Sequence, residues 1–435
     1  MSIVERILSG EIQGVFIDSR KPIKDGLFVP IIGEKFNGNS YIIDAFEGGA
    51  KTSLVQKEYY EQNPNQFEGR DVYIVDDTLE ALQFLASEYR DSLSIPVVGI
   101  TGSNGKTTTK NMLKCMVETT YKTYATLGNF NNEIGMPLSI LNVPRDTEVI
   151  ILEMGMSGPG EISELVAIAK PTIGIITNIG ESHMEFFEDK MELLKAKMEI
   201  SERMTKADSL ILNGEDEYLN RIESDDFNLY RTDEVRLTDI QNNHGYYRFN
   251  YQGEQVELRV PGGHNVINIK LAIRAAEILG ITPQLIKQGI ENYTGESMRL
   301  EKIEVGGVTI INDAYNSSPA SMKAALKTLI QMDGERKLAV IGDMYELGER
   351  SEQWHREVGE SVEAKSLDMI FTVGEDSEYI IKDQPLKSAK HFKQLNKLNQ
   401  ELLRVLRPGD ILLVKASRGM ELDRVVSFLM ENYHG

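Results

Sequence analysis

The sequence is short of cysteine, of basic residues and of long apolar runs. Its single cysteine, Cys115, rules out a disulfide within the chain and fits a reducing compartment. Lys and Arg number 47 against 67 Asp and Glu, a formal net charge of −20 at pH 7. We therefore expect no nonspecific binding to nucleic acid or to anionic membranes. No apolar run approaches the roughly 18 residues of a membrane span, and the first residues lack a signal-peptide pattern, so we expect a cytoplasmic protein without membrane insertion.

What the sequence does contain is a repeated alternation of short apolar runs with helical patterns. Runs that are apolar on both faces and are separated by helices are typical of buried parallel strands. We therefore expect an α/β fold with mostly parallel sheets, in which ligands bind at the carboxyl ends of the strands. The runs are VVGI (97–100), VIILEMG (149–155), IGIITNIG (173–180), SLILNG (209–214), VTIINDAYN (308–316), KLAVIGDM (337–344), DMIFTVG (368–374) and DILLVKAS (410–417).

Two regions depart from this alternation and indicate the domain organisation. Residues 1–93 contain short strand patterns around polar turns, and residues 226–260 contain an alternating pattern about Gly253 that predicts an antiparallel hairpin. A chain of 435 residues is long enough for several domains, each with its own core. We expect three: a small α/β domain over 1–93, a central domain over 94–298 and a C-terminal α/β domain over 299–435.

The most informative segment is TGSNGKTTT (101–109), directly after the apolar run that ends at Ile100. A strand that turns through a Gly-rich loop into a helix can hold nucleotide phosphates, because free backbone N–H groups and the helix N-terminus both attract anions. Lys106 can reach the terminal phosphates, and the Thr107 hydroxyl can bind Mg²⁺. The loop is a variant, since Ile100 stands where the common spacing has its first glycine. The residues expected to contact the nucleotide here are Gly102, Ser103, Asn104, Gly105, Lys106, Thr107 and Thr108.

Further candidates follow the other runs of the central region. Glu153 follows the residues VIIL of the second run, at the expected end of that strand, where a carboxylate can meet a loop-bound Mg²⁺; the alternative is a surface residue in a turn. His183 follows the third run, and its place at the same sheet edge favours a ligand role over a structural one. For Lys197, in a helical pattern, the spacing assigns no role. Asn268 could bond to a purine edge, but helix capping by Asn265 explains the segment equally well.

Polar residues after two runs of the last third also look like ligand contacts. Helix capping does not explain Asp313, Tyr315 and Asn316 in the first group, or Lys415, Ser417 and Arg418 in the second. The second group follows the last apolar run and is expected to open the final helix. A basic group at a helix N-terminus opposes the helix dipole, so an anionic ligand explains the group better than stability does.

Taken in order, the motifs of the chain resemble those of the Mur ligases of peptidoglycan synthesis, and the resemblance covers nearly the whole chain. It implies a UDP-sugar-binding domain, a central ATPase and a C-terminal Rossmann-like domain that closes on the other two. The segments that carry it are IDSRKPIKDGLFVPIIGEKFNGNSYIIDAFEGGA (17–50), TGSNGKTTTKNM, GNFNNEIGMP (128–137), LEMGMSGPGEI (152–162), TNIGESHME (177–185), KAKMEI (195–200), GGHNVIN (262–268), MRLE (298–301), NDAYNSSPASMKAA (312–325) and GDMYELGERSEQWH (342–355).

The resemblance also implies roles that the residue pattern alone left open. For the UDP-muramyl-peptide it implies contacts from Ser19, Arg20, Asn129, Asn131 and Asn132. For magnesium it implies Thr107, Glu153, His183 and a carbamoylated Lys197 that holds a second ion, with Lys106, His183 and Lys197 in catalysis. For the nucleotide it implies Asn268 at adenine and Arg299 and Asp313 at the ribose and phosphates. For the nucleotide or an incoming dipeptide it implies Tyr315, Asn316, Ser417 and Arg418.

The activity implied by the resemblance is ATP-dependent and Mg²⁺-dependent amide formation by a monomer. The expected substrates are UDP-N-acetylmuramoyl-tripeptide and D-alanyl-D-alanine, joined through an acyl phosphate. One alternative is a related ligase that adds the third amino acid or a polyglutamate-type residue. Another is a nucleotide-dependent switch or kinase. The 17–50 segment argues against a polyglutamate-type ligase, and Asn396-Lys397 continues as Leu-Asn, so the guanine-specific Asn-Lys-x-Asp motif is absent.

Overall fold

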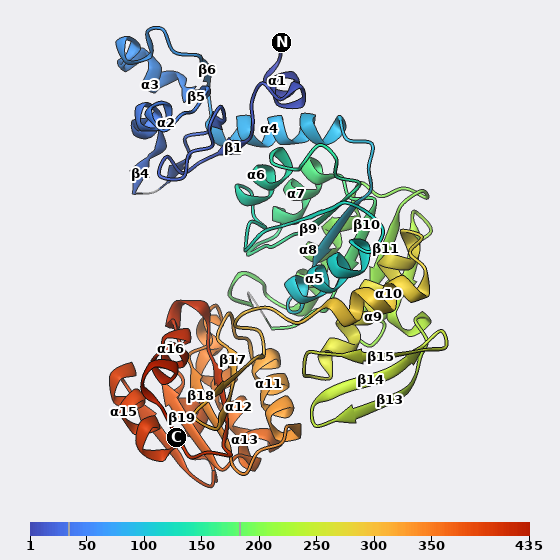
Figure 1. The fold of residues 1–435 in the computed structure, drawn as a ribbon, viewed down its shortest axis with the longest axis vertical. Coiled ribbons are helices and arrows are strands. Elements are labelled where there is room, and N and C mark those ends of the chain that lie inside the picture. The colour runs from blue at the N-terminus through green and yellow to red at the C-terminus, as the bar shows by residue number, and fades with distance from the viewer. Residues whose placement is uncertain (34, 182–183) are drawn as a thin grey trace.

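The computed structural model describes residues 1–33, 35–181 and 184–435, which form three α/β units joined end to end (Figure 1). The N-terminal unit is built on a parallel sheet in the order β1-β2-β5-β6. Its elements are α1 (Ile3–Ser9), β1 (Val15–Phe16), β2 (Leu27–Phe28), β3 (Ile32–Gly33), β4 (Phe36–Asn37), η1 (Gly38–Tyr41), α2 (Ile42–Glu47), β5 (Thr52–Gln56), α3 (Lys57–Gln62), η2 (Pro64–Phe67), β6 (Val72–Val75) and α4 (Thr78–Asp91).

The central unit carries a parallel sheet in the order β12-β11-β10-β7-β9-β8. Its first elements are β7 (Val97–Thr101), α5 (Lys106–Val117), β8 (Thr123–Ala125), α6 (Gly135–Leu141), β9 (Val149–Glu153), α7 (Glu161–Ala169), β10 (Ile173–Ile176), η3 (Met184–Phe186), α8 (Lys190–Met198) and η4 (Glu199–Ser201). They are followed by β11 (Ser209–Leu212), η5 (Leu219–Arg221), β12 (Asn228–Arg231) and η6 (Thr232–Glu234).

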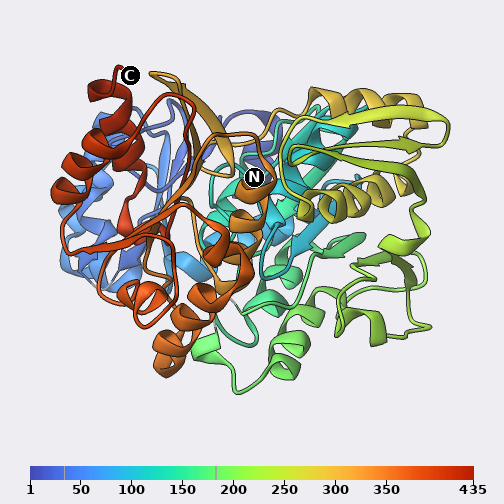
Figure 2. The same ribbon diagram turned by 90° about the horizontal axis from the view of Figure 1, so that it is seen from below.

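An antiparallel sheet and two helices complete the central unit. The sheet, β13-β14-β15, contains the predicted hairpin, with Gly253 at a φ of +88° in its turn. The two helices pack against α5, the helix that follows β7. In Figure 2 the antiparallel sheet and this helix pair lie together on one side of the molecule. The elements are β13 (Leu237–Asn243), β14 (Tyr246–Tyr251), β15 (Glu254–Leu258), α9 (His264–Ile278) and α10 (Pro283–Asn292).

The C-terminal unit has a sheet in the order β16-β17-β21-β18-β19-β20, in which only the edge pair β16-β17 is antiparallel. Ser318 caps α11, with Pro319 as its first residue. The elements are β16 (Glu301–Val305), β17 (Val308–Asp313), α11 (Pro319–Gln331), β18 (Lys337–Gly342), η7 (Gly348–Arg350), α12 (Ser351–Glu360), α13 (Val362–Ser366), β19 (Met369–Val373), α14 (Glu378–Ile381), β20 (Ala389–Phe392), α15 (Leu395–Val405), β21 (Ile411–Lys415), η8 (Arg418–Met420) and α16 (Asp423–Asn432).

The apolar runs of the sequence became buried parallel strands, as predicted. Every residue of β7, β9 and β21 is buried, because helices cover both faces of each sheet. The first apolar cluster continues from the N-terminal unit into the central one, where Leu82 and Tyr89 of α4 pack with residues such as Leu141. Helix α4 therefore lies across the end of the central unit, as Figure 1 shows. Among the described residues, none of the helices is both long and apolar enough to span a bilayer.

Candidate active site

A cavity of about 1030 Å³ opens between the central and C-terminal units. Its walls include Ser103, Glu153 and Asn178, which lie at or just beyond the carboxyl ends of β7, β9 and β10. The C-terminal unit contributes Asp313 and Lys415, the last residues of β17 and β21. The carboxyl ends of parallel strands from two sheets therefore face one space, which is where α/β proteins bind ligands.

The phosphate-loop segment has the geometry that its glycines predict. Gly102 and Gly105 have φ values of +139° and +82°, in the region that favours glycine. A Cβ on Gly105 would also lie 2.6 Å from Asn268 Oδ1. The loop is tied to the end of β10, because Asn104 N donates to Asn178 Oδ1 at 3.0 Å and Asn178 Nδ2 donates to Asn104 O at 2.9 Å. The loop is thus held open at the N-terminus of α5, ready for an anion.

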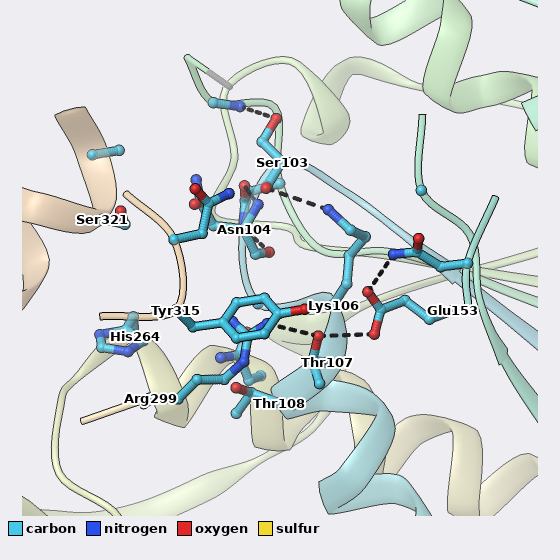
Figure 3. Close-up of a pocket in the computed structure, with 18 of the residues that line it drawn as sticks. Ser103, Asn104, Lys106, Thr107, Thr108, Glu153, His264, Arg299, Tyr315 and Ser321 are labelled. Atoms are coloured by element: carbon cyan, nitrogen blue, oxygen red, sulfur yellow. Dashed lines mark hydrogen bonds between the residues drawn. The ribbon is translucent and has the colours of Figure 1, made fainter. Parts of the chain in front are cut away.

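Lys106 lies folded over this loop. Its Nζ donates to the Gly102 carbonyl at 2.7 Å and to the Ser103 carbonyl at 3.5 Å, and Figure 3 draws the second of these bonds. Desolvation lowers the pKa of Lys106 from its ordinary value, and the Glu153 carboxylate opposes that change. When a nucleotide binds, the Lys106 ammonium can exchange its bond to the Gly102 carbonyl for a bond to a phosphate oxygen. The exchange needs little movement of the chain.

Glu153 is the charged centre of the cavity floor and is almost completely buried. Its Oε2 accepts from Thr107 Oγ1 and its Oε1 from Asn131 Nδ2, both at 2.8 Å (Figure 3). A carboxylate beside a hydroxyl offers the hard oxygen ligands that Mg²⁺ prefers. No group of three or more His, Cys, Asp or Glu suited to a metal is found in residues 1–33, 35–181 and 184–435. One carboxylate and one hydroxyl fit an ion that keeps waters and phosphate oxygens in its shell, as Mg²⁺ does.

Arg299, in the segment between α10 and β16, contacts the same hydroxyl. Its Nη2 donates to Thr107 Oγ1 at 2.9 Å, and its guanidinium lies 4.1 Å from the centroid of the Tyr315 ring. Beside it, Lys415 Nζ forms an ion pair with Asp313 Oδ2 at 2.7 Å. Two cations and a carboxylate from the C-terminal side thus face the phosphate loop, with the tyrosine holding the arginine side chain in place.

Most of the residues proposed from the sequence line this one cavity. They are Ser103, Asn104, Gly105, Lys106, Thr107, Thr108, Asn129, Asn131, Asn132, Glu153, Asn268, Arg299, Asp313, Tyr315, Asn316 and Lys415. Gly102 supports the loop through its carbonyl. His183 lies outside the described residues. The alternative capping role of Asn265 is not seen, because α9 starts at His264 after Gly263 and Asn265 donates instead to Pro261 O at 2.8 Å.

The remaining proposed residues lie away from the cavity lining. Ser19 and Arg20 belong to the N-terminal unit, where the exposed Arg20 pairs with Asp18 at 2.8 Å. The Ser417 hydroxyl accepts from Tyr345 N at 2.8 Å. The expectation that Ser417 and Arg418 open the final helix is wrong. Arg418 lies in the 3₁₀ turn η8, and α16 starts only at Asp423, with which Arg418 pairs at 3.1 Å.

Lys197 lies on α8 and is 1% exposed. Burial, reinforced by the nearby charge of Lys106, lowers the pKa of Lys197 well below that of an ordinary lysine. A lysine with a lowered pKa exists as the reactive neutral amine at a lower pH than an ordinary lysine does. Helical spacing gave no sign of this, because it does not show which neighbouring elements cover a side chain.

Sequence reasoning missed Asn178 and Glu346. Asn178 holds the phosphate loop with its side-chain amide, and Glu346 lines the cavity after β18. Asn178 lies in the polar end of the run at 173–180, and Glu346 is the second residue after the run at 337–344. Their place near a strand end was therefore the available signal. Glu346 has a φ of +63°, which is uncommon outside glycine and is found at functional sites more than elsewhere.

Comparison with known proteins gives a consistent result along the chain. The family model described as Mur ligase middle domain matches residues 100–276, and that described as Mur ligase, glutamate ligase domain matches residues 298–418. The chain is 39% identical to the UDP-N-acetylmuramoyl-tripeptide–D-alanyl-D-alanine ligase of Bacillus subtilis, over 97% of this chain and 94% of the relative. It is 31% identical to the Escherichia coli protein of the same name, over 99% and 98%.

Solved structures give the same answer for the fold. A crystal structure of MurF from Acinetobacter baumannii superposes with a TM-score of 0.88 at 28% identity, covering 97% of this chain and 94% of that one. MurF ligase from Thermotoga maritima in complex with ADP gives 0.85 at 28% identity, covering 96% and 97%. The three-unit architecture is therefore that of these enzymes, and the chain belongs to the Mur ligase family.

Proposed function

We propose that this chain is the ligase that joins D-alanyl-D-alanine to UDP-N-acetylmuramoyl-tripeptide at the expense of ATP, the reaction for which its full-length relatives are named. The observation that carries the proposal is the shared cavity in which the phosphate loop, Glu153 and Arg299 meet. ADP in the Thermotoga relative supports the assignment of ATP as the nucleotide.

The three units share the binding of the three substrates in this proposal. Residues 1–93 bind the UDP moiety, with Ser19 and Arg20 as contacts. Residues 94–298 bind ATP and, through Asn129, Asn131 and Asn132, the muramyl peptide. Residues 299–435 bind the dipeptide and close on the nucleotide. For the adenine we assign Asn268, and for the ribose and phosphates Arg299 and Asp313. Tyr315, Asn316, Ser417 and Arg418 are assigned to the nucleotide or the dipeptide.

The chemistry follows from the weakness of a carboxylate as an electrophile. The terminal carboxylate of the tripeptide attacks the γ-phosphorus of ATP, which gives an acyl phosphate and ADP. The dipeptide amine then attacks the acyl carbon, loses a proton, and expels inorganic phosphate. Lys106, Arg299 and the loop N–H groups offset the charge on the phosphoryl oxygens during transfer. Holding the reactants together in a good geometry lowers the activation free energy by up to about 7–11 kcal/mol.

Magnesium fits the donors that the chain supplies, Thr107 and Glu153, with His183 as a further proposed ligand. When bound, the ion offsets phosphate charge during phosphoryl transfer. We assign a second ion to a carbamate on Lys197. A neutral lysine amine adds to carbon dioxide and releases a proton, so the buried, weakly basic Lys197 suits this modification. We also assign the enzyme to the cytoplasm as a monomer.

Phosphate release from ATP tests the proposed function directly. The purified protein is incubated with ATP and UDP-N-acetylmuramoyl-tripeptide, with and without D-alanyl-D-alanine, and the product is weighed by mass spectrometry. Release that needs both substrates, with the mass of the pentapeptide product, supports the proposal. Equal stimulation by L-lysine or meso-diaminopimelate in place of the dipeptide would instead indicate a ligase that adds the third residue.

The role of Lys197 is tested with a matched pair of variants on α8. Lys197→Ala is expected to abolish turnover and to regain part of it with small carboxylates that replace the carbamate. Lys195→Ala, which removes an exposed lysine of the same helix, is expected to retain activity. A fully active Lys197→Ala enzyme would show that the carbamate has no part in the reaction.

A further inference from the structure

The carboxylate of Glu296 attaches the linker between the central and C-terminal units to α5, the helix that follows the phosphate loop. The linker comprises residues 293–300, between the end of α10 and the start of β16. Glu296 Oε1 accepts from Asn111 Nδ2 at 2.8 Å and from the Tyr293 hydroxyl at 2.7 Å. Its Oε2 accepts from Thr108 Oγ1 at 3.4 Å. Asn111 and Thr108 both belong to the first two turns of α5, directly after the phosphate loop.

Tyr293 covers one side of this attachment, which is partly buried. Its side chain is 3% exposed. Burial, with the neighbouring Glu296 carboxylate as the next cause, raises the pKa of Tyr293 far above that of an ordinary tyrosine. The hydroxyl therefore keeps its proton and remains a donor to Glu296. A hydrogen bond to a charged acceptor is among the stronger ones that proteins make.

The rest of the linker is attached to the C-terminal unit instead. Ser297 Oγ donates to Glu301 Oε2 at 3.1 Å, and Met298 N donates to the same oxygen at 2.9 Å. Met298 has a φ of +60°, a conformation that costs free energy for a residue with a side chain. The attachment of the linker thus changes from one unit to the other between Glu296 and Ser297.

Arg299 depends on both attachments. Its backbone N–H donates to the Glu296 carbonyl at 3.3 Å, so the two residues close a tight turn. The side chain then reaches Thr107 and stacks on Tyr315. Fixing the turn against α5 fixes the point from which the arginine leaves the backbone. Figure 3 shows the result, with Arg299 lying between Tyr315 and the phosphate-loop threonines.

We propose that Glu296 is a positioning residue that holds Arg299 at the phosphate loop by tying the linker to Asn111 and Thr108. The inference rests on the proposed function, in which Arg299 contacts the nucleotide. Glu296 is not among the described residues that line the cavity. It therefore acts through Arg299 and not by touching a ligand.

A graded pair of substitutions tests the role. Glu296→Ala removes the acceptors for all three donors, whereas Glu296→Gln keeps an oxygen for Tyr293 and Asn111. We expect Glu296→Ala to weaken ADP binding, measured by calorimetry, and to raise the KM for ATP, each by about tenfold. The KM for the UDP-linked tripeptide should stay unchanged, and Glu296→Gln should recover most of the loss. Glu291→Ala, which removes a carboxylate paired with Lys287 on the surface of α10, is the matched control.

A double-mutant cycle with Arg299→Ala decides the mechanism, because residues that act through one another give non-additive effects. If Glu296 acts through Arg299, Glu296→Ala adds no further loss of ADP affinity in the Arg299→Ala background. Three outcomes would overturn the proposal. The first is that the fold-losses of ADP affinity in the two single variants multiply in the double variant. The others are that Glu296→Ala alone loses no ADP affinity, or that it raises every KM equally. A wild-type protein that binds ADP but forms no amide would refute the proposed function, while the binding cycle would still decide the role of Glu296.

Discussion

Lys110 Nζ lies 3.9 Å from Glu153 Oε2, and both side chains are almost completely buried. Lys110 also donates to the Thr126 carbonyl at 2.7 Å, and the Thr126 hydroxyl accepts from Glu153 N at 3.0 Å. Burial lowers the pKa of Lys110, and the Glu153 carboxylate opposes the change. One ammonium thus joins α5, the end of β9 and the strand end that leads to the asparagine loop at 129–132.

Replacing this lysine should destabilise the protein. Lys110→Met leaves Glu153 buried without its cation, and breaking a buried pair in this way costs about 3–5 kcal/mol. We expect a loss at the lower end of that range, because Thr107 and Asn131 still donate to the carboxylate. Urea unfolding monitored by fluorescence measures the change in the free energy of unfolding.

The double variant Lys110→Met with Glu153→Gln provides the control for that measurement. The double variant has no uncompensated carboxylate, so we expect its free energy of unfolding to be larger than that of Lys110→Met alone. Equal stability of the single and double variants would mean that Lys110 contributes packing and its bond to Thr126, and no charge compensation.

Gly105 should be indispensable for nucleotide binding. Gly105→Ala places a side chain at a φ of +82° and within 2.6 Å of Asn268 Oδ1. Gly280→Ala is the matched control, because Gly280 has a φ of +79° and nothing within 4 Å of the added Cβ. Both variants should lose about 1–2 kcal/mol of stability from the left-handed backbone. Only Gly105→Ala should lose ATP affinity, measured by calorimetry. Equal affinities of the two variants would contradict the assigned phosphate loop.

The sheets could be predicted from the sequence because each central strand is apolar on both faces. A strand that is buried on both faces is apolar at every position and does not alternate between apolar and polar residues. Runs such as 149–155 and 410–417 can therefore be recognised as buried strands. The hairpin at Gly253 was equally readable, since its strands alternate about a turn residue. Local patterns of this kind also predicted that Lys106 and Glu153 belong to the site, because each lies just after the apolar residues of such a run.

Contacts between residues far apart in the chain could not be predicted. The pairing of Asp313 with Lys415 depends on β17 and β21 being neighbours in the sheet, which no local pattern reports. In the sequence, Glu296 is indistinguishable from an ordinary polar linker residue, because its partners on α5 lie far from it along the chain. The start of the last helix was misjudged at Arg418 because a 3₁₀ turn and Glu421, at a φ of +51°, intervene.

The Tyr315 ring should contribute to nucleotide binding through Arg299. Tyr315→Leu removes the aromatic face that lies 4.1 Å from the guanidinium, and a cation–π contact is worth about 0.5–2 kcal/mol. We expect the KM for ATP to rise by roughly two- to thirtyfold. Tyr315→Phe keeps the ring and should retain most of the affinity. If the two variants lose equal affinity, the hydroxyl and not the ring is the important group.

His355 should make the C-terminal unit sensitive to acid. Its ring is fully buried, Met344 N donates to its Nε2 at 3.0 Å, and its Nδ1 lies 2.8 Å from Ser351 O. Burial lowers the pKa of His355, although the Ser351 carbonyl and the nearby Asp343 and Asp376 carboxylates oppose the change. The folded protein therefore holds a neutral ring at pH values where the unfolded chain has begun to bind a proton.

The sign of the pH effect follows from that difference. The stability that depends on a neutral His355 is complete above about pH 6.5, the pKa of an unperturbed histidine, and is lost as pH falls toward the lower folded pKa. One such group changes the free energy of unfolding by at most about 1.4 kcal/mol per pH unit. His355→Gln cannot titrate, so its urea-unfolding free energy should fall less than that of the wild type between pH 7.5 and pH 5.5. Parallel losses in the two proteins would assign the acid sensitivity to other groups.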